Sequence, residues 1–378
     1  MKIGIDISQI VYDTGVSNYT KSLVSALIAV DKSNQYVLFG GSFRQRGVLR
    51  DFTNKFQNNK SVSTRLTLIS PRVADILWNR IHKIPIDVFI GKTDVFHASD
   101  WTQPPTRAAK ITTIHDLVPL KFPESLPKEI IAAHLNRFKW VKKECDLIIA
   151  VSKSTKKDIV ELLEIPPDKI KVIYEASHEH IDPNTQVRPE IIKKIFKTYN
   201  IKKPFFLSVA TLEPRKNLLR VLEAMVKLPK SVQLVLVGKF GWGTNEIIQK
   251  IKKLGLSDRI VLTGYIPAQE LSVLYKNAIA LVYVSLYEGF GLSVLTALTA
   301  GLPVIISDVS SLPEIGGDAA FYVNPQNVDD IRQKMEKMLN LTSKARREII
   351  TRGLVQAKKF SWEKTARQTL EVYREVKE

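Results

Sequence analysis

The sequence predicts an α/β protein built from two doubly wound parallel sheets. The chain of 378 residues is long enough for two domains of about 150 residues each. Short β-branched runs alternate along it with longer amphipathic segments, and the same rhythm occurs in both halves. Strands that are apolar throughout and separated by helices are typical of parallel sheets covered on both faces.

Each expected strand is a short apolar run next to an amphipathic segment. The expected strands of the first half are Lys2–Asp6, Tyr36–Phe39, Asp94–Ala98, Ile111–His115, Asp146–Val151 and Lys171–Tyr174. Those of the second half are Phe205–Ala210, Val232–Gly238, Arg259–Thr263, Ile279–Val284 and Pro303–Ser307. Apolar residues at helical spacing predict helices at Ser17–Val30, Glu129–Lys143, Lys153–Leu163, Asn217–Leu228, Asn245–Leu254, Ala268–Asn277, Gly291–Ala300, Val328–Leu339 and Ser343–Phe360.

The two domains are expected to meet near Ala176–Pro204, a polar stretch with prolines that breaks the alternation of strands and helices. We therefore predict one domain over residues 1–180 and a second over residues 181–360. Ligands of parallel sheets bind beyond the carboxyl ends of the strands. Two sheets that face each other are thus expected to hold a site in the cleft between them.

Composition excludes several classes of protein. With 44% hydrophobic and 25% charged residues, the chain is neither disordered nor fibrous. The single cysteine, Cys145, excludes an intramolecular disulfide, and no apolar run reaches the roughly 18 residues that cross a bilayer. We therefore expect a cytoplasmic protein. The net charge of +18 favours anionic partners, but the basic residues are spread over both halves without a nucleic-acid-binding motif.

A glycine-rich turn in the second half suggests a site for a phosphorylated sugar. Glu288 follows an apolar strand, and Gly289 and Gly291 open the next helix. Glycines there let backbone N–H groups and the positive helix end approach an anion. The carboxylate of Glu288 suits sugar hydroxyls, which donate hydrogen bonds. The alternative is an ordinary strand–helix turn whose acid is favoured by the helix dipole.

A basic pair, Arg215 and Lys216, also follows an apolar strand and stands at the start of the next helix. Cations are unfavourable at a helix start unless an anion is present. An Arg fork and a Lys point charge together suit a diphosphate. The alternative is a solvated basic pair on the surface.

Three strand ends of the first half carry candidate ligand contacts. Gly15 opens a helix and could bring the backbone near a phosphate or an acceptor, or it could be a plain loop glycine. The G-x-G-x-x-G spacing of a dinucleotide site is absent. His115 stands where a strand breaks and could donate to a sugar hydroxyl or to developing charge, or simply cap the strand. Asp100 and Trp101 follow another strand and could line an acceptor pocket. No metal-ligating spacing, nucleophile elbow or P-loop appears, so we expect no metal.

Two basic amphipathic stretches, Pro71–Lys92 and His134–Lys143, combine Trp with Lys and Arg. This composition suits a peripheral contact with a membrane surface. The alternative for each stretch is a core helix with a solvated basic face.

Taken in order, these segments resemble the retaining glycosyltransferases of family 4 (glycosyl transferases group 1), which have the GT-B fold. The resemblance spans essentially the whole chain and is closest to mannosyl- and rhamnosyltransferases that extend cell-surface polysaccharides. It is carried by KIGIDISQI, DTGVSNYT, DVFHASD, TTIHDLVPLKFPE, DLIIAVSKST, SVATLEPRKNL, LVLVGKFGW, RIVLTGYI, SLYEGFGLSVL, AGLPVIISDVSSLPEIGGDAAFYVNP and FSWEKTARQTL. It implies a donor site in the C-terminal domain, an acceptor site in the N-terminal domain, and a last helix, residues 361–378, that packs back onto the N-terminal domain.

The resemblance also implies roles for particular residues. Arg215 and Lys216 match a diphosphate clamp, and His115 matches a histidine beside the reacting sugar. Glu288 matches the first acid of the family's E-x7-E motif and would bind hydroxyls of the donor sugar. The further donor contacts that it implies are Gly15, Gly264, Tyr265, Gly289, Phe290, Gly291 and Leu292.

One position departs from the family pattern. Thr296 stands eight residues after Glu288, where the family has a second Glu that accepts bonds from the ribose hydroxyls. A hydroxyl is shorter and uncharged, so one or two charge-assisted bonds of about 1.5–3 kcal/mol each are lost or replaced.

We therefore expect a retaining glycosyltransferase without a metal or other cofactor. It would move a hexose, with GDP-mannose favoured over a UDP- or dTDP-sugar, to a saccharide or lipid-linked saccharide. Three alternatives stay open: a nucleotide-sugar epimerase of the same fold, a weakly active nucleotide-sugar-binding protein, suggested by Thr296, and a nucleic-acid binder, suggested only by the charge.

Overall fold

The computed structural model describes residues 1–377 except 13, 178–180, 184 and 242. The chain divides into two compact units, one of Met1–His178 with Ser361–Glu378 and the other of Glu179–Phe360. Part of the predicted boundary, residues 178–180 and 184, lies outside the described residues. Each unit is described below by itself.

The first unit is built on a parallel sheet of seven strands in the order β3-β2-β1-β4-β5-β6-β7. The strands are β1 (Lys2–Asp6), β2 (Gln35–Gly41), β3 (Val62–Thr67), β4 (Val95–Ala98), β5 (Ala109–Ile114), β6 (Leu147–Ala150) and β7 (Ile170–Val172). The order reverses between β1 and β4, which places a topological switch point at the carboxyl ends of these two strands.

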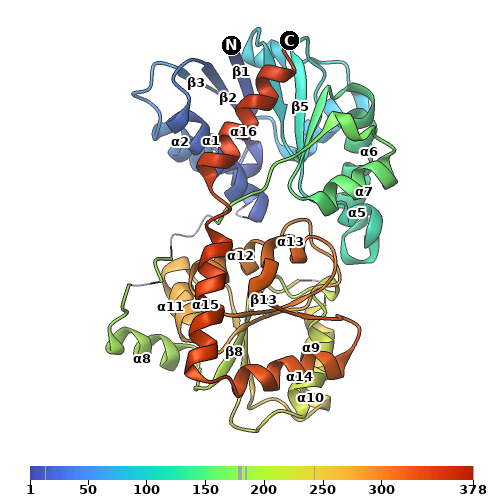
Figure 1. Cartoon of the computed structure of the whole chain (residues 1–378). Coiled ribbons are helices and arrows are strands. Elements are labelled where there is room, and N and C mark those ends of the chain that lie inside the picture. The colour runs from blue at the N-terminus through green and yellow to red at the C-terminus, as the bar shows by residue number, and fades with distance from the viewer. Residues whose placement is uncertain (13, 178–180, 184, 242, 378) are drawn as a thin grey trace. The chain divides into compact units, whose positions relative to one another are not determined.

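Helices cover this sheet, and the last helix of the chain belongs to the same unit. The helices are α1 (Gly15–Val30), α2 (Arg46–Asn54), α3 (Pro71–Ala74), α4 (Asp87–Ile90), α5 (Val118–Lys121), α6 (Lys128–Glu144), α7 (Lys153–Leu163) and α16 (Trp362–Glu375). α16 packs against α1 (Figure 1). Its Leu370 and Tyr373 are buried in the same core cluster as Ile5 of β1 and Leu23 of α1.

The second unit is built on a parallel sheet of six strands in the order β10-β9-β8-β11-β12-β13. The strands are β8 (Phe205–Val209), β9 (Gln233–Val237), β10 (Ile260–Gly264), β11 (Leu281–Tyr283), β12 (Val304–Ser307) and β13 (Ala320–Val323). The helices are α8 (Pro189–Thr198), α9 (Leu218–Val226), α10 (Thr244–Lys253), α11 (Ala268–Asn277), α12 (Leu292–Thr299), α13 (Leu312–Gly316), α14 (Val328–Leu339) and α15 (Ser343–Ala357).

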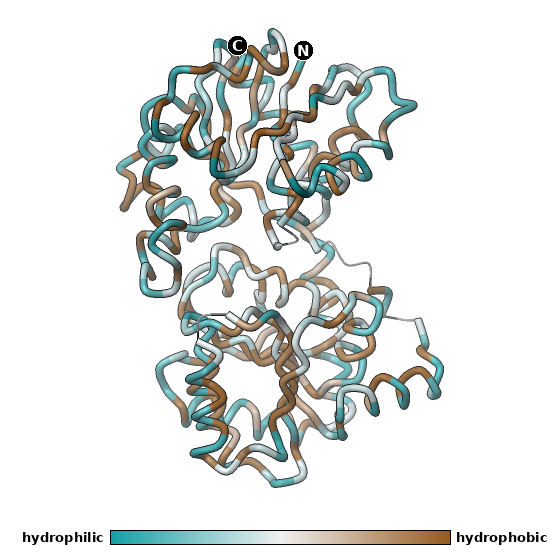
Figure 2. The backbone as a smooth tube through the Cα atoms, turned by 180° about the vertical axis from the view of Figure 1, so that it is seen from behind, coloured by the Kyte–Doolittle hydropathy of each residue, from teal (hydrophilic) through white to brown (hydrophobic). Residues whose placement is uncertain are grey.

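The central strands of both sheets are apolar, as parallel strands covered on two faces require. Figure 2 shows hydrophobic residues along these strands and hydrophilic residues along many of the helices. Leu234 and Leu236 of β9, for example, are at most 1% exposed, as is Val282 of β11. Two parallel sheets of this kind confirm the predicted fold class.

Two strands were not predicted, and both lie at the edge of a sheet. The sequence of β3, VSTRLT, is half-buried rather than continuously apolar, and β13 is only four residues long and partly exposed. An edge strand has one neighbour instead of two and does not need an apolar run on both faces, so the rule for buried strands does not detect it.

Candidate functional site

The basic pair of the second unit lies in a tight turn after β8. Arg215 and Lys216 belong to the 3₁₀ turn Pro214–Lys216, and α9 begins two residues after Lys216. The sequence placed them at the helix start itself. The structure differs because Asn217 adopts a left-handed conformation, with φ of 59°, and its side-chain amide donates to the backbone oxygens of Val284, at 3.0 Å, and Pro325, at 2.7 Å. These bonds hold the turn against the loops that follow β11 and β13.

Both cations of this turn contact the carboxylate of Glu288. Nη1 of Arg215 lies 3.1 Å from Glu288 Oε2, and Nζ of Lys216 lies 2.6 Å from Oε1. Nη2 of Arg215 pairs with Glu213 at 2.6 Å, and Lys216 also donates to the hydroxyl of Tyr283 at 3.0 Å. We call Glu213, Arg215, Lys216 and Glu288 the charged cluster.

Burial and mutual charge set the ionisation of this cluster. Burial alone would raise the pKa of Glu288, but the charges of Lys216 and Arg215 and the bond from Lys216 lower it to about 2. The pKa of Lys216 is lowered by burial and by the neighbouring Arg215, against the opposing effect of Glu288. Glu288 is therefore ionised at neutral pH and can only accept hydrogen bonds.

The turn from Gly289 to Leu292 is held by Ser311 and needs glycine at one position. Ser311 Oγ donates to the backbone oxygens of Glu288, at 2.9 Å, and Phe290, at 2.7 Å. Gly291 has φ of 115°, and a Cβ on it would lie 2.9 Å from a side-chain carbon of Leu312. α12 begins immediately afterwards, at Leu292.

The remaining donor candidates of this unit lie at different distances from the charged cluster along the sheet. Thr296 is buried on α12. Gly264, with φ of 69°, ends β10, and Tyr265 after it is 62% exposed. The charged cluster follows β8 and β11, which are neighbours, whereas β10 is separated from β8 by β9. Tyr265 thus stands two strands away from Arg215 at the same edge of the sheet.

In the first unit, His115 follows β5 and is oriented by a carboxylate. Its Nδ1 lies 2.8 Å from Oε1 of Glu175, which is buried, and the ring of Tyr19 packs edge-on at 4.5 Å. Among the residues that the structure describes, its buried Nε2 has no hydrogen-bond partner. His115 lines a cavity together with Asp6 and Asp100; the volume of this cavity, with the open solvent at its mouth included, is about 300 Å³.

Glu175 determines the charge of His115. Burial alone would lower the pKa of the histidine, but the hydrogen bond and charge of Glu175, with smaller effects of Asp100 and Asp116, raise it above the ordinary value. His115 therefore keeps a proton to higher pH than a free histidine. The neighbouring His97 behaves in the opposite way, because burial lowers its pKa to about 3.

Asp100 and Trp101 follow β4 and have separate partners. Oδ1 of Asp100 lies 3.2 Å from Nη1 of Arg137, and the ring of Trp101 lies 5.4 Å from that of Tyr12. Gly15 is exposed at the first position of α1. Asp13, which precedes it in the quoted motif, lies outside the described residues.

The two basic amphipathic stretches fold differently. On α6, Phe138 and Val141 are buried and the lysines are exposed, which agrees with a core helix that has a solvated basic face. Arg137 is an exception: it is completely buried and donates to Thr112 Oγ1 at 2.8 Å. The stretch Pro71–Lys92 buries Trp78 but leaves Val73, Ile76, Ile81, Ile84 and Val88 exposed.

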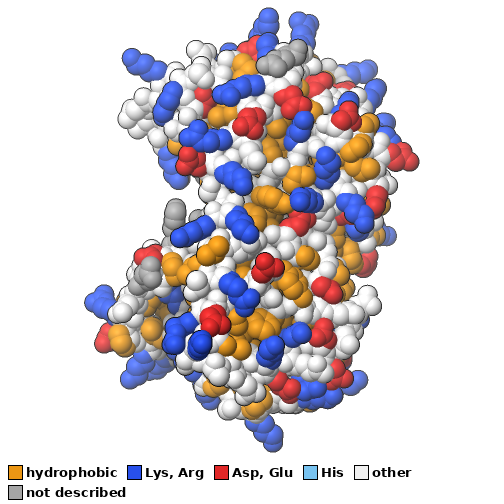
Figure 3. Space-filling model, viewed as in Figure 1, with side chains coloured by type: hydrophobic (Ala, Val, Ile, Leu, Met, Phe, Trp, Pro, Cys, Tyr) orange, Lys and Arg blue, Asp and Glu red, His pale blue; other side chains and the backbone are white. Residues whose placement is uncertain are grey.

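Three further observations concern the distribution of basic side chains, the possible metal ligands and the length of the apolar helices. On the face that Figure 3 draws, Lys and Arg side chains are scattered rather than gathered into one strip. Within the described part of the chain, no group of three or more His, Cys, Asp or Glu side chains is placed to hold a metal ion. Of the helices in that same part, none has the length and apolarity needed to span a bilayer.

Comparison with known proteins identifies the family. The family model described as Glycosyltransferase Family 4 matches residues 14–176, and the one described as Glycosyl transferases group 1 matches residues 191–355. The chain is 30% identical over 372 residues to the O-antigen chain mannosyltransferase B of Escherichia coli, with 96% of each chain covered. This chain belongs to the family 4 glycosyltransferases.

Other comparisons agree with this assignment. The glycosyltransferase is 33% identical over 265 residues to the serotype-specific mannosyltransferase WbdA of Escherichia coli, which covers 68% of this chain and 32% of the relative. Its fold is similar to that of a glycosyltransferase from Rickettsia africae, with a TM-score of 0.73, 19% identity and coverage of 99% and 98%. HepE of Anabaena, crystallised in complex with UDP and glucose, gives a TM-score of 0.71 at 18% identity, with coverage of 98% and 99%. These likenesses confirm the GT-B fold.

Sequence reasoning missed three charged partners of the candidate residues. Glu213 lies inside the quoted SVATLEPRKNL motif, and Glu175 follows β7 at the same sheet edge as His115. Both could have been found by treating every acid after a strand as a candidate. Arg137 gave no such signal, because a buried arginine on an amphipathic helix has the same spacing as an exposed one.

We expect Glu175→Gln to lower the pKa of His115. The substitution removes the negative charge that opposes burial, and burial favours the neutral ring. The pKa is measured by NMR titration of the imidazole resonances.

Asp116→Asn is the matched control, because Asp116 makes a smaller contribution to the same shift, and its effect should be smaller. An unchanged His115 pKa in Glu175→Gln would show that Glu175 does not hold the proton on the ring.

Proposed function

We propose that this protein is a retaining mannosyltransferase that uses GDP-mannose to extend a saccharide in cell-surface polysaccharide synthesis. The observation that carries the proposal is the charged cluster at the carboxyl ends of β8 and β11, where Arg215 and Lys216 both contact Glu288. The relatives named as O-antigen and serotype-specific mannosyltransferases support the sugar and the process.

The charged cluster suits a nucleotide-diphosphate sugar through an exchange of partners. Without donor, Glu288 and Glu213 together neutralise the two cations, so their burial is compensated. When a diphosphate arrives, its oxygens take bonds from Arg215 and Lys216, and Glu288 turns its free lone pairs to the sugar hydroxyls. The cations are in place beforehand, so they need little reorganisation.

The same cations account for catalysis without a metal. Cleavage of the glycosyl–phosphate bond leaves negative charge on the departing diphosphate. Fixed cations and the backbone N–H groups near Gly289 stabilise that charge in the transition state. The acceptor then attacks from the face that the nucleotide is leaving, which retains the configuration, and a phosphate oxygen takes the proton of the acceptor hydroxyl.

The acceptor would bind in the first unit. Asp100 can accept from a saccharide hydroxyl, and Trp101 can pack against a sugar ring. His115 lines the cavity, and its Nε2 has no hydrogen-bond partner among the described residues. When protonated, this nitrogen would donate to the reacting sugar. A saccharide alone or one linked to a lipid fits this role.

We further propose that the protein acts in the cytoplasm as a peripheral protein of the membrane surface. The exposed apolar side chains of Pro71–Lys92 lie among basic ones, a combination that binds anionic lipid headgroups. The side chains that support this contact are Val73, Ile76, Ile81, Ile84, Arg72, Arg80 and Lys83.

We expect Lys216→Ala and Glu288→Ala each to lower the turnover number at least about tenfold, or ~1.4 kcal/mol of transition-state stabilisation. Each loses a contact to the leaving diphosphate or to the donor sugar. Turnover is measured with GDP-mannose and a mannose-terminated oligosaccharide.

Lys227→Ala is the matched control, because Lys227 pairs with Asp329 at the surface, and it should keep normal turnover. Near-normal rates in both cluster variants would refute this donor site. A changed sugar formed from donor alone would indicate an epimerase instead.

We expect GDP-mannose to raise the unfolding temperature more than UDP-, dTDP- or ADP-sugars do, since a ligand that binds only the folded state stabilises it. Thermal-shift measurements at equal concentrations compare the four nucleotides. A larger increase in unfolding temperature with a UDP-sugar would show that the enzyme prefers uracil to guanine as the base of its donor.

We expect activity to persist in excess EDTA, because the protein's own cations stabilise the leaving group. Initial rates before and after chelation test this. Loss of activity with EDTA and recovery with Mn²⁺ would contradict the mechanism.

A further inference from the structure

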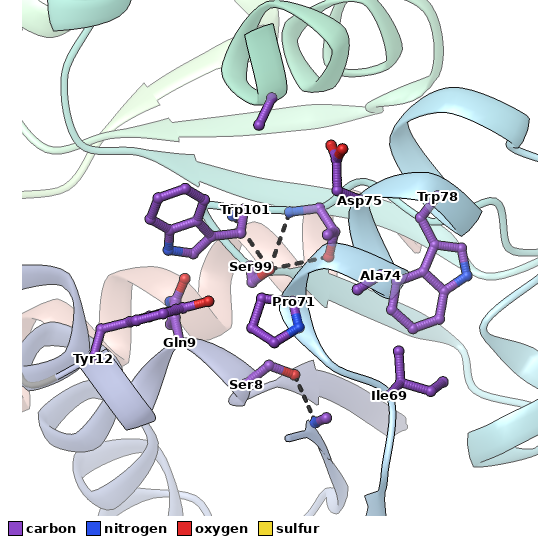
Figure 4. Close-up of a pocket in the computed structure, with 13 residues that line it drawn as sticks. Ser8, Gln9, Tyr12, Ile69, Pro71, Ala74, Asp75, Trp78, Ser99 and Trp101 are labelled. Atoms are coloured by element: carbon purple, nitrogen blue, oxygen red, sulfur yellow. Dashed lines mark hydrogen bonds between the residues drawn. The ribbon is translucent and has the colours of Figure 1, made fainter. Parts of the chain in front are cut away.

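A second cavity in the first unit lies beside the one that contains His115. With the open solvent at its mouth included, its volume is about 450 Å³. Its lining comes from the end of β2, from the segments that follow β1, β3 and β4, and from α3, the π-helical turn Asp75–Ile81 and α6 (Figure 4). Gln9 lines both cavities. Its side-chain nitrogen donates to Thr20, and its Oε1 accepts the backbone N–H of Asp100 at 2.7 Å. One side chain therefore separates the two spaces.

Aromatic and aliphatic side chains form the walls of this second cavity. Figure 4 shows Tyr12 and Trp101 on one side and Ala74 and Trp78 on the other, with Pro71 between them. The indole N–H of Trp78 donates to a backbone oxygen at 3.0 Å, so that ring is fixed in place. The walls offer flat apolar surfaces of the size of a ring.

The serines of the cavity already have partners. Ser8 Oγ donates to Asp6 at 2.5 Å and accepts the backbone N–H of Gly41 at 2.9 Å. Ser99 Oγ accepts the backbone N–H of Thr102 at 3.3 Å. These hydroxyls fix the walls and leave little hydrogen-bonding capacity for a ligand.

The carboxylate of Asp75 can still accept further hydrogen bonds. Its Oδ1 accepts from Asn79 at 2.9 Å and its Oδ2 from Nε of Arg80 at 2.8 Å. Each carboxylate oxygen has a second lone pair, and the side chain is 14% exposed, so a ligand hydroxyl can reach it. The cavity thus combines apolar walls with one carboxylate acceptor.

This combination selects the chemistry of the occupant. An alkyl chain would cover the carboxylate of Asp75 without offering it a hydrogen bond, which is unfavourable. An ionised phosphate would offer Asp75 only acceptor oxygens and no donor. A sugar ring offers C–H faces to the aromatic walls and hydroxyl donors to Asp75.

We propose that this cavity binds a second sugar ring of the acceptor, adjacent to the ring that carries the attacking hydroxyl. The inference rests on the proposed transferase function and extends it: the enzyme recognises an acceptor of at least two sugars. Tyr12, Trp101 and Trp78 hold the C–H faces of that ring, and Asp75 accepts one of its hydroxyls.

The kinetic test compares acceptors of one and two sugars. With GDP-mannose as donor, kcat/KM for methyl α-mannobioside should be at least about ten times kcat/KM for methyl α-mannoside. The ratio of these two values measures the contribution of the second sugar ring. Ala74→Leu fills the cavity and should lower this ratio at least about fivefold. Asp75→Asn keeps the shape of the cavity but removes the charge of the acceptor, and it should lower the same ratio. This variant provides the test if Ala74→Leu does not fold.

Ala132→Leu is the matched control, because Ala132 makes the same change of side chain on α6, where it is exposed and lies outside the cavity lining. It should leave the ratio unchanged. A ratio near one in the unaltered enzyme, or a ratio unaffected by both cavity variants, would overturn the proposal.

A binding measurement separates this inference from the transferase function. In protein labelled with 5-fluorotryptophan, methyl glycosides of hexose disaccharides, mannobiose first, should shift the ¹⁹F resonances of Trp78 and Trp101. The resonance of Trp140, which stacks on His82, is the reference and should stay in place.

These shifts without sugar transfer would uphold the sugar site and refute the transferase proposal. If the enzyme transfers sugar but none of the disaccharide glycosides shifts these resonances, the proposed sugar site is refuted. Shifts caused by hexanol but by no disaccharide would identify an apolar ligand and refute it as well.

Discussion

The candidate donor site depends on keeping two buried cations and a buried carboxylate together. Arg215, Lys216 and Glu288 have side chains about one-tenth exposed. Charges at such depth are stable only when paired, and removing one partner of a buried pair costs about 3–5 kcal/mol. The pairing in turn requires β8 and β11 to be neighbours, because the cations follow one strand and the carboxylate follows the other. The adjacency of β8 and β11 is therefore what balances these charges at this edge of the sheet.

The first unit uses the same arrangement at its own sheet edge. His115 after β5 pairs with Glu175 after β7, and Asp100 after β4 pairs with the buried Arg137 of α6. In each case a polar group that a ligand could contact is oriented by a buried partner from another element. Such support fixes the geometry of a site before a ligand arrives, which reduces the reorganisation needed on binding.

Much of the fold was predictable because buried parallel strands have a strong local pattern. Continuous apolar runs located the inner strands to within a few residues, and amphipathic spacing located α7, α11 and α14 with the observed bounds. The edge strands β3 and β13 escaped because partial exposure weakens that pattern. For the site, the rule that ligands bind after strand ends selected Arg215 and Glu288, but it did not reveal that they contact each other.

The sequence by itself determined the α/β class, the periodicity of each element and the chemical groups that stand at the ends of strands. These are local properties, set by residues a few positions apart. The tertiary structure alone decided which strand ends are neighbours, that Lys216 and Arg215 share Glu288, and that Glu175 holds His115. The physical reason is that such pairs join residues about 60 to 70 positions apart, through crossover helices whose packing no local pattern encodes.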